Sequence, residues 1–395
     1  MKIAVVVHGR FHAFDLTREL IGLGHEVLLL TNYPKRWPEK FGVPPKNVRS
    51  LVAHGILSRA ALALGKATGK EKLWEPFLHQ WFGRWAAKTI ETNPVDASHC
   101  FSGVALEILE DPLAKQKIRS LVRGSSHIQI QKEILEKEEK RAGRKIEKPS
   151  DWMIARERAE YRAADLIICL SQFAYDSFVA MGKPKEKLIL NPLGVQQKIF
   201  QAPAEVLRLR QERILSQKLR VLTTGTFSLR KGAIDYVAVA EAMRNRMEFV
   251  FRGDIAPDAQ FLMSRARQSI KFLPRTEQSK LPQNYFQADL FLFPTLEDGY
   301  AAVLAQASAA GLPILATANC GARDFLKNEQ EAWIFPIRRP DLMVERLEWC
   351  DKNREELVKV ARQAGVPRKG IEWKDRAKRL VGAYGEFLQR KKGIG

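Results

Sequence analysis

The sequence lacks several features that would assign it to a class at once. No stretch approaches the 18 or more apolar residues that a membrane-spanning helix needs, and runs such as 164–170 are short. The N-terminus has no apolar region long enough for a signal peptide. The cysteines form no C-x-x-C pair and show no metal-ligand spacing; they are Cys100, Cys169, Cys320 and Cys350. We therefore expect a reduced, cytoplasmic protein.

The sequence also has no internal repeat, no low-complexity tract and no concentrated block of charge. The net charge is +20, but residues 1–200 carry 32 basic and 22 acidic side chains and residues 201–395 carry 33 and 23. Each half is therefore +10, whereas a nucleic-acid module would concentrate the charge, and no such motif is present. We expect no nucleic-acid partner. An evenly spread positive charge favours binding of anionic small molecules or of an anionic membrane surface. The alternative is that the charge only increases solubility.

What the sequence does contain is an alternation of short apolar runs with helical patterns, which is typical of parallel α/β sheets. One series of predicted strands covers 2–7, 25–31, 94–101, 117–123 and 164–170. A second covers 219–225, 247–253, 269–274, 289–294 and 313–317. Residues 190–205, rich in Pro, Gly and Gln, read as a linker. The pattern predicts two doubly wound domains with a cleft between them.

Two helical segments carry amphipathic patterns. Residues 372–392 predict a terminal helix with Lys and Arg between its apolar positions. Residues 51–92 predict helices with an aromatic stripe: Trp74, Phe77, Trp81, Phe82 and Trp85. Basic residues flank this stripe: Lys66, Lys70, Lys72, Arg84 and Lys88. Peripheral contact with an anionic membrane is one interpretation, and packing of the stripe into the core is the other.

Polar segments follow the predicted strands, at the edge where open α/β sheets bind ligands. Three of the seven histidines lie in such segments: His8, His99 and His127. The segment 225–232, GTFSLRKG, places Arg230 and Lys231 between Gly225 and Gly232, and a helix is expected to begin at Gly232. A glycine-framed loop at a helix N-terminus with two cations predicts a diphosphate site. The alternative is a surface loop with two solvated cations.

The segment 294–313 predicts a strand end, a turn at 297–299, a helix from about Tyr300 to Ala310 and a Gly-Leu-Pro lead into the next strand. Asp298 precedes the helix, where an Asp caps well and its charge is favoured. Gln306 lies eight residues later, near the same face, and interrupts an Ala-rich helix. A capping role explains the presence of Asp298, but it does not explain why a polar Gln306 interrupts this helix.

At these residues the chain resembles the family-4 retaining glycosyltransferases of the GT-B fold, in its bacterial cell-surface glycan branch. The resemblance covers nearly the whole chain. Its motifs are the R-K-G loop, "LPQNYFQADLFLFPT", "EDGY" and "A-x-A-x-G-L-P", preceded by an N-P-x-G-V turn at 191–195 and by "RGSSHIQIQKEILEKEE" at 123–139. It implies an acceptor-binding domain at 1–195 joined by the terminal helix 374–395, and a donor-binding domain at 196–373.

The resemblance also implies residue roles. Arg230 and Lys231 would hold the donor diphosphate, with Gly225 beside them. Asp298 would touch the donor sugar, and the backbone at Gly299, Tyr300 and Ala301 would meet sugar and phosphate. His127 would lie close to the sugar, and Gly9 near the phosphates or the acceptor. The reaction implied is metal-independent transfer, with retention, from a UDP- or GDP-linked sugar to a glycan or lipid-linked acceptor, with no cofactor.

Two positions depart from the family pattern. Gln306 stands where the second glutamate normally binds the ribose, and Thr226 stands where an Arg is often found. An amide can bind two hydroxyls but carries no charge, so we expect weaker donor binding or an altered nucleotide preference. Another GT-B enzyme, such as a nucleotide-sugar epimerase or an inverting transferase, is therefore an alternative. So is a catalytically silent relative that binds nucleotide sugars or glycans.

Overall fold

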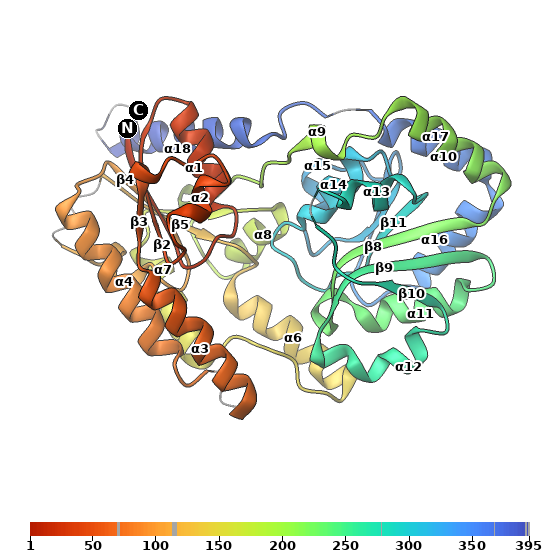
Figure 1. Ribbon diagram of the computed structural model, residues 1–395, viewed down its shortest axis with the longest axis horizontal. Coiled ribbons are helices and arrows are strands. Elements are labelled where there is room, and N and C mark those ends of the chain that lie inside the picture. Colours follow the sequence, from red (N-terminus) through yellow and green to blue (C-terminus); the bar gives the residue numbers. More distant parts are fainter. Residues whose placement is uncertain (69–71, 113–116, 278, 367, 392, 394–395) are drawn as a thin grey trace.

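In the computed structural model the chain forms two lobes, each built on a parallel sheet with helices on both faces (Figure 1). The structure describes residues 1–68, 72–112, 117–277, 279–366, 368–391 and 393. Within these residues the N-terminal sheet has seven strands in the order β3-β2-β1-β4-β5-β6-β7, and the C-terminal sheet has six in the order β10-β9-β8-β11-β12-β13. Both orders reverse direction once, between β1 and β4 and between β8 and β11. This is the doubly wound topology that the alternating pattern predicts.

The N-terminal sheet is buried on both faces, because successive residues of its central strand enter opposite cores. In β1, the side chains of Ile3, Val5 and Val7 point to one face, where they pack with α1 and with the terminal helix α18 (Trp373–Lys391). Those of Ala4 and Val6 point to the other face, where they pack with α4, α5, α7 and α8. Its strands are β1 (Lys2–Val7), β2 (Glu26–Thr31), β3 (Val48–Ser50), β4 (Ala97–Phe101), β5 (Ile118–Arg123), β6 (Leu166–Cys169) and β7 (Leu188–Leu190). Its helices are α1 (Ala13–Gly22), α2 (Arg36–Glu39), α3 (Val52–Thr68), α4 (Glu75–Thr92), α5 (Leu106–Leu109), α6 (Ile128–Ala142), α7 (Asp151–Ala163) and α8 (Gln172–Ala180).

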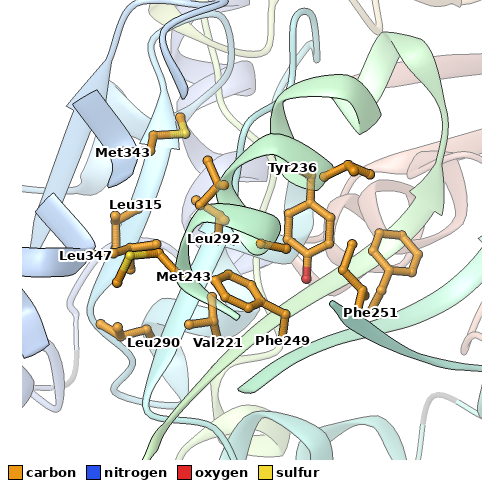
Figure 2. Close-up of a cluster of buried hydrophobic side chains, with 14 of the residues drawn as sticks. Val221, Tyr236, Met243, Phe249, Phe251, Leu290, Leu292, Leu315, Met343 and Leu347 are labelled. Carbon is orange, nitrogen blue, oxygen red and sulfur yellow. The ribbon is translucent and has the colours of Figure 1, made fainter. Parts of the chain in front are cut away.

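The C-terminal sheet repeats this plan. Its strands are β8 (Leu219–Phe227), β9 (Met247–Ile255), β10 (Ile270–Leu273), β11 (Leu290–Phe293), β12 (Ile314–Thr317) and β13 (Ala332–Phe335). Its helices are α9 (Gln197–Phe200), α10 (Ala204–Ser216), α11 (Ala233–Met243), α12 (Met263–Ala266), α13 (Leu281–Phe286), α14 (Ala302–Ala309), α15 (Ala322–Phe325), α16 (Pro340–Lys352) and α17 (Arg354–Ala364). Figure 2 shows one of its cores, where Tyr236 and Met243 of α11 meet Phe249 of β9 and Leu347 of α16.

Three segments join the two halves. The linker lies against the start of α18 (Trp373–Lys391): the Val195 amide donates to the Ile371 carbonyl at 3.0 Å, and a Cβ on Gly194 would lie 2.4 Å from Trp373 Cα. Helix α18 then returns to the N-terminal half, where it packs on α1 and contributes Leu380 and Tyr384 to the core (Figure 1). Helix α6 lies between the lobes and places Leu135 in the C-terminal core.

The structure corrects the predicted elements at short strands. The strands β3, β7 and β13, of three or four residues each, were not predicted, because so few residues show no periodicity. Strand β8 also continues two residues beyond Gly225, to Phe227, and a 3₁₀ turn at Leu229–Lys231 precedes α11. The strand continues because Gly225 lies opposite Gly253, where a Cβ would lie 1.7 Å from the Gly225 carbonyl oxygen. The predicted domain boundaries themselves stay a prediction.

The aromatic stripe of residues 74–85 is divided between core and surface. Phe82 is fully buried and Trp85 packs against its cluster, whereas Trp74 and Phe77 are exposed. Among the helices that the structure describes, none combines the length and the apolar character needed to cross a bilayer. Of the flanking lysines, Lys70 and the side chain of Lys66 lie outside the described residues.

Candidate functional site

The largest described cavity, about 1010 Å³, lies between the two halves and is lined by residues of both. Its walls follow the switch points of the two sheets. His8 follows β1 and Ser102 follows β4, while Arg230 follows β8 and Asp298 follows β11. The carboxyl ends of strands flanking a switch point leave a crevice, because their crossover connections run in opposite directions. Here two such crevices face each other across one space.

The wall of the C-terminal half begins with the loop after β8. Gly232 adopts φ +76° at the start of α11, and a Cβ there would lie 1.9 Å from the Pro294 carbonyl oxygen. Only glycine therefore allows this loop to pack so closely on the end of β11. The Leu296 amide donates to the Arg230 carbonyl at 3.0 Å, which joins the loop to the 294–298 segment. Arg230 lines the large cavity, and Lys231 lines an adjoining one of about 210 Å³.

Asp298 does not cap α14, which begins at Ala302 without a side-chain cap; instead it holds the turn before that helix. One carboxylate oxygen accepts the backbone N–H groups of Tyr300 at 3.1 Å and Ala301 at 2.8 Å, and the other pairs with Lys231 Nζ at 2.5 Å. Burial alone would raise the pKa of Asp298, but Lys231 and Arg230 lower it below the ordinary value. Ala301 takes φ +63°, a conformation in which a Cβ is strained. The carboxylate thus holds the turn at the edge of the cavity.

Glu297 is a charged residue whose importance the sequence did not indicate. It is fully buried, and one carboxylate oxygen accepts from the Ser125 hydroxyl and from Ser126, through its amide at 3.0 Å and its hydroxyl at 2.9 Å. The other accepts from Gln131 Nε2 at 3.1 Å and pairs with Arg230 at 2.7 Å. Burial raises the pKa of a carboxyl, but these donors outweigh it and hold the pKa of Glu297 at about 2. The two predicted diphosphate cations are therefore each paired with an acid of one turn.

Gln306 lines the large cavity from α14, on the same wall as Asp298. Its Oε1 accepts a hydrogen bond from the Tyr285 hydroxyl at 2.8 Å, and that hydroxyl lies 2.8 Å from Thr224 Oγ1. The amide oxygen is thus held in place by a buried tyrosine. Its Nε2 group has no protein partner among the described residues, so it is free to donate to a ligand.

The wall of the N-terminal half combines neutral rings with charged side chains, since Arg10, Asp15, Lys40, Arg123, Glu147 and Glu157 also line the cavity. His8, His12 and His79 line the cavity. Burial, with repulsion from His79 and His54, lowers the pKa of His8 to about 3, and burial with His99 lowers that of His12 to about 3. Burial likewise lowers the pKa of His79 to about 4, against a hydrogen bond to the Gly103 carbonyl at 2.8 Å. These imidazoles are neutral at physiological pH.

Aromatic side chains continue this wall. Phe11 stacks on Phe101 with ring centroids 5.7 Å apart, and His12 lies 4.7 Å from Phe101 and 6.0 Å from Trp373. Phe11 is 68% exposed and takes φ +40°, so a large apolar ring is held at the cavity in an uncommon backbone conformation. The N-terminal wall therefore offers flat ring faces beside its own ion pairs, whereas the C-terminal wall offers the ion-paired Arg230 and Asp298.

The predicted site residues divide into two groups. Arg230, Asp298, Tyr300, Ala301 and Gln306 line the large cavity, and Gly225 and Lys231 line the smaller one, which shares Asp298 and Ala301 with it. Gly9, Gly299 and His127 are not among the described residues that line either cavity. Gly9 lies between two lining residues and accepts from Thr31 Oγ1 at 2.9 Å, whereas a Cβ on Gly299 would lie 2.1 Å from the Gly124 carbonyl oxygen.

His127, which the resemblance places close to the sugar, does not line either described cavity, and its role stays a prediction. It is buried at the start of α6, where its Nδ1 accepts from the Gln129 amide at 3.3 Å, and its ring packs on Tyr161 and Phe178. Nor does His99 line the large cavity: it is buried in β4, and its Nδ1 lies 2.9 Å from the Tyr384 hydroxyl. Of the three histidines singled out, only His8 lines the cavity.

The structure adds residues that sequence reasoning missed. His12 belongs to the same segment after β1 as His8, so a strand-end signal was available for it. His79 lies within α4 and Trp373 is the first residue of α18, and both are far from His8 in the sequence. No local sequence pattern links them to the cleft. Among the described residues, no group of three or more His, Cys, Asp or Glu side chains is arranged to hold a metal ion.

Solved structures with this architecture are glycosyltransferases of the GT-B type. The chain is similar to Anabaena HepE in complex with UDP, with a TM-score of 0.68 and 15% identity over 98% of this chain and 100% of that one. It is also similar to sucrose-phosphate synthase from Thermosynechococcus elongatus, with a TM-score of 0.74 and 15% identity over 99% and 100%. At such identities the likeness establishes the fold, which is the GT-B fold that the resemblance implied.

Sequence comparisons agree with the fold. Residues 218–353 match the family "Glycosyl transferases group 1". The amylovoran biosynthesis glycosyltransferase AmsK of Erwinia amylovora is 24% identical over 185 residues, 44% of each chain. The D-inositol 3-phosphate glycosyltransferase of Mycobacteroides abscessus is 27% identical over 125 residues, 30% of this chain and 26% of that one. The matches thus span less than half of these relatives. Together with the fold, they support a glycosyltransferase family of the GT-B type.

Proposed function

We propose that this protein transfers a sugar from a nucleoside-diphosphate sugar to a glycan or lipid-linked acceptor, with retention at the anomeric carbon. The observation that carries the proposal is the cavity between the two sheets, with Arg230, Asp298 and Gln306 on one wall and, among other residues, ring faces such as Phe11 and Trp373 on the other. A charged wall suits the phosphates of a donor, and apolar ring faces suit the faces of a sugar. The two substrates would then meet between the halves.

The chemistry rests on the departing diphosphate. The bond from the anomeric carbon to the phosphate oxygen breaks, and negative charge develops on that oxygen. Arg230, Lys231 and the N-terminal end of α14 can stabilise this charge. The bond to the acceptor oxygen forms on the same face, and the acceptor proton passes to the leaving phosphate oxygen. Because side chains supply the positive charge, we propose that turnover needs no metal ion and survives EDTA.

The test is a panel of UDP- and GDP-linked sugars, measured by thermal shift and by slow hydrolysis in the absence of acceptor. UDP-linked sugars come first, because HepE has been solved with UDP and with UDP-glucose. We expect one base to raise the melting temperature and one of its sugars to be hydrolysed. If no nucleoside diphosphate of either base binds, the proposed function is wrong. A strict requirement for a divalent metal would refute the assigned leaving-group site.

Because Gln306 stands where the family pattern has a glutamate, the experiment must also distinguish the alternative functions. An epimerase would release a free sugar or change its configuration without any acceptor, and an inverting transferase would give the opposite anomer. Proton NMR of the product distinguishes these outcomes from retention. A catalytically silent relative would bind the nucleotide sugar and leave it intact. The proposal predicts an acceptor-dependent product with the anomeric configuration of the donor.

We also propose that the protein contacts the inner face of the membrane through the tip formed by α3 and the start of α4. The exposed apolar side chains of this tip are Val52, Ile56, Leu57, Leu62, Leu64, Leu73, Trp74 and Phe77. In Figure 1 these two helices run side by side and project from the N-terminal lobe. Exposed Lys72, Arg84 and Lys88 accompany them, and the chain as a whole is +20. Apolar side chains beside cations suit an anionic bilayer surface.

Sedimentation with anionic vesicles tests this contact. The double variant Leu73→Ser with Phe77→Ser should lose most vesicle binding, because both side chains are more than half exposed. Glu at Lys66, Lys70, Lys72 and Arg84 should also release the protein, as should high salt, because each cation near the surface contributes about 1 kcal/mol. Leu215→Ser, a similarly exposed position on α10, is the matched control. Equal binding by all variants would show that the tip does not contact lipid.

A further inference from the structure

The carboxylate of Glu297 joins three parts of the molecule that are far apart in the sequence. It belongs to the turn after β11, it pairs with Arg230 from the loop after β8, and it accepts from Ser125 and Ser126 in the loop after β5. The first two parts belong to the C-terminal half and the third to the N-terminal half. A single buried side chain thus connects a predicted diphosphate cation to the opposite wall of the cavity.

The two backbones also meet at this point. A Cβ on Gly299 would lie 2.1 Å from the Gly124 carbonyl oxygen and 2.7 Å from Ser125 Cα. Only glycine permits such an approach, so the turn 297–299 and the loop 124–126 are in direct contact. Glu297 itself does not line the cavity among the described residues, whereas Arg230, Ser125 and Gln131 do. Glu297 therefore lies behind the residues that a ligand would touch.

The bonds of Arg230 show what Glu297 does to it. Nε donates to Glu297 Oε2 at 2.9 Å, and Nη2 lies 2.7 Å from the same oxygen and donates to Ser125 Oγ at 3.2 Å. Two of the three nitrogens are thus fixed, and Nη1 has no protein partner among the described residues. A guanidinium held along one edge keeps its other edge available for an anion.

We infer that Glu297 is a positioning residue: it fixes Arg230 for the donor diphosphate and makes that orientation depend on contact between the two halves. The inference rests on the proposed function and deepens it. When the loop 124–126 is in place, its donors hold the carboxylate, and the carboxylate holds Arg230. When the halves separate, Glu297 loses the Ser125, Ser126 and Gln131 donors, and the guanidinium loses part of its support. Tight diphosphate binding and closure are then linked.

Binding of UDP and GDP, with uridine and guanosine as phosphate-free controls, tests the inference by calorimetry. Glu297→Gln should weaken the nucleoside diphosphate that the wild type binds by roughly five- to ten-fold and leave the nucleoside unchanged. Ser126→Ala should act in the same direction and more weakly, since it removes one donor to Glu297 from the opposite half. Asp324→Ala is the matched control, because Asp324 accepts from the Gln172 amide at 2.8 Å in a second contact between the halves, away from Arg230.

A double-mutant cycle decides whether Glu297 acts through Arg230. In the Arg230→Ala background, Glu297→Gln should add less than about two-fold to the loss of diphosphate affinity, because its target is gone. A full loss in that background would overturn the positioning role, as would unchanged diphosphate affinity in both Glu297→Gln and Ser126→Ala. An equal loss in Asp324→Ala would also overturn it, because general closure would then suffice. Failure of the wild type to bind UDP or GDP would instead refute the proposed function.

Discussion

The two walls of the cavity are built in different ways. The C-terminal wall takes its charged residues from two short segments, 228–231 and 297–306, and the residues of each segment are neighbours in the sequence. The N-terminal wall also holds charged side chains, but its rings come from the segment after β1, from α4, from β4 and from α18, so that His8, His79, Phe101 and Trp373 meet only in the folded chain. Charged residues that are neighbours in one loop can be predicted from the sequence. A wall whose residues lie far apart in the sequence cannot. The difference also predicts a division of labour between donor and acceptor.

The largest expected effect concerns the contact between the walls. The pKa of Glu297 is lowered from 4.5 to about 2, so its pairing stabilises the fold above pH 4.5 and is lost as the pH falls from 4.5 toward 2. The ionised Glu297 thus contributes about 3 kcal/mol to the free energy of unfolding above pH 4.5. Urea unfolding between pH 6 and 3.5 should show the advantage of the wild type over Glu297→Gln shrinking as the pH falls. A constant difference would mean that this carboxylate is not held ionised by its partners.

The next largest effect is on the charged wall alone. Arg230→Ala and Lys231→Ala should each weaken nucleoside diphosphate binding by about 1.5–3 kcal/mol, the usual loss for a hydrogen bond to a charged group. The free nucleoside should bind almost as before in calorimetry. Because each substitution also leaves an acid unpaired, thermal unfolding must confirm that the variants are folded. Equal losses for both ligands would remove the phosphate site from this loop.

Gln306 sharpens the comparison within the charged wall. Gln306→Glu should tighten nucleotide binding by about 1 kcal/mol, because a carboxylate accepts from ribose hydroxyls more strongly than an amide. Gln306→Leu should weaken it by a similar amount. The Tyr285 hydroxyl can donate to either oxygen-bearing side chain, so the Glu variant keeps the existing contact. Normal nucleotide affinity in the Leu variant would show that this side chain does not face the ribose.

Phe11 tests the aromatic part of the N-terminal wall. Phe11→Ala removes an exposed ring stacked on Phe101 and should raise the KM for acceptor by roughly three- to ten-fold, the equivalent of about 0.5–1.5 kcal/mol of ring contact. Nucleoside diphosphate affinity should stay the same. The exposed Phe261 of the C-terminal half is the matched control. A change in donor affinity would contradict the division between the walls.

The smallest expected effect is that the KM for the acceptor does not change near pH 6.5, the ordinary pKa of histidine. The lowered pKa values of His8, His12 and His79 leave these rings neutral in the fold, and their contribution to stability is present above pH 6.5 and falls as the pH decreases below it. The KM for acceptor should therefore show no step near pH 6.5. A profile measured from pH 5.5 to 7.5 checks this. A step that disappears in His8→Gln would show that the His8 ring becomes charged in this pH range.

Much of the architecture was predictable because it rests on local patterns. The short apolar runs at 2–7, 219–225 and 289–294 predicted buried parallel strands, which the structure contains. The Ala-rich segment after Asp298 forms a helix as predicted, but Asp298 bonds to the turn before it and does not cap it. The strands of three residues, β3 and β7, were missed because they form only beside a neighbour that pairs with them. A strand-end position alone also does not say which way a side chain points, so the sequence could not show that His127 packs on Tyr161 and Phe178; its role near the sugar stays a prediction.

The sequence by itself determined the doubly wound fold class and the charged segments that face the cleft, because strand periodicity, glycine turns and helix caps are short-range properties. Only the tertiary structure decided which cation pairs with which acid. It turned Glu297 from a turn residue into the junction of the two halves, since its donors Ser125, Ser126 and Gln131 lie more than 160 residues away. It also brought Trp373 beside His12, because α18 returns to the N-terminal sheet and buries its apolar face there. Such contacts depend on burial across the whole chain, which no local pattern encodes.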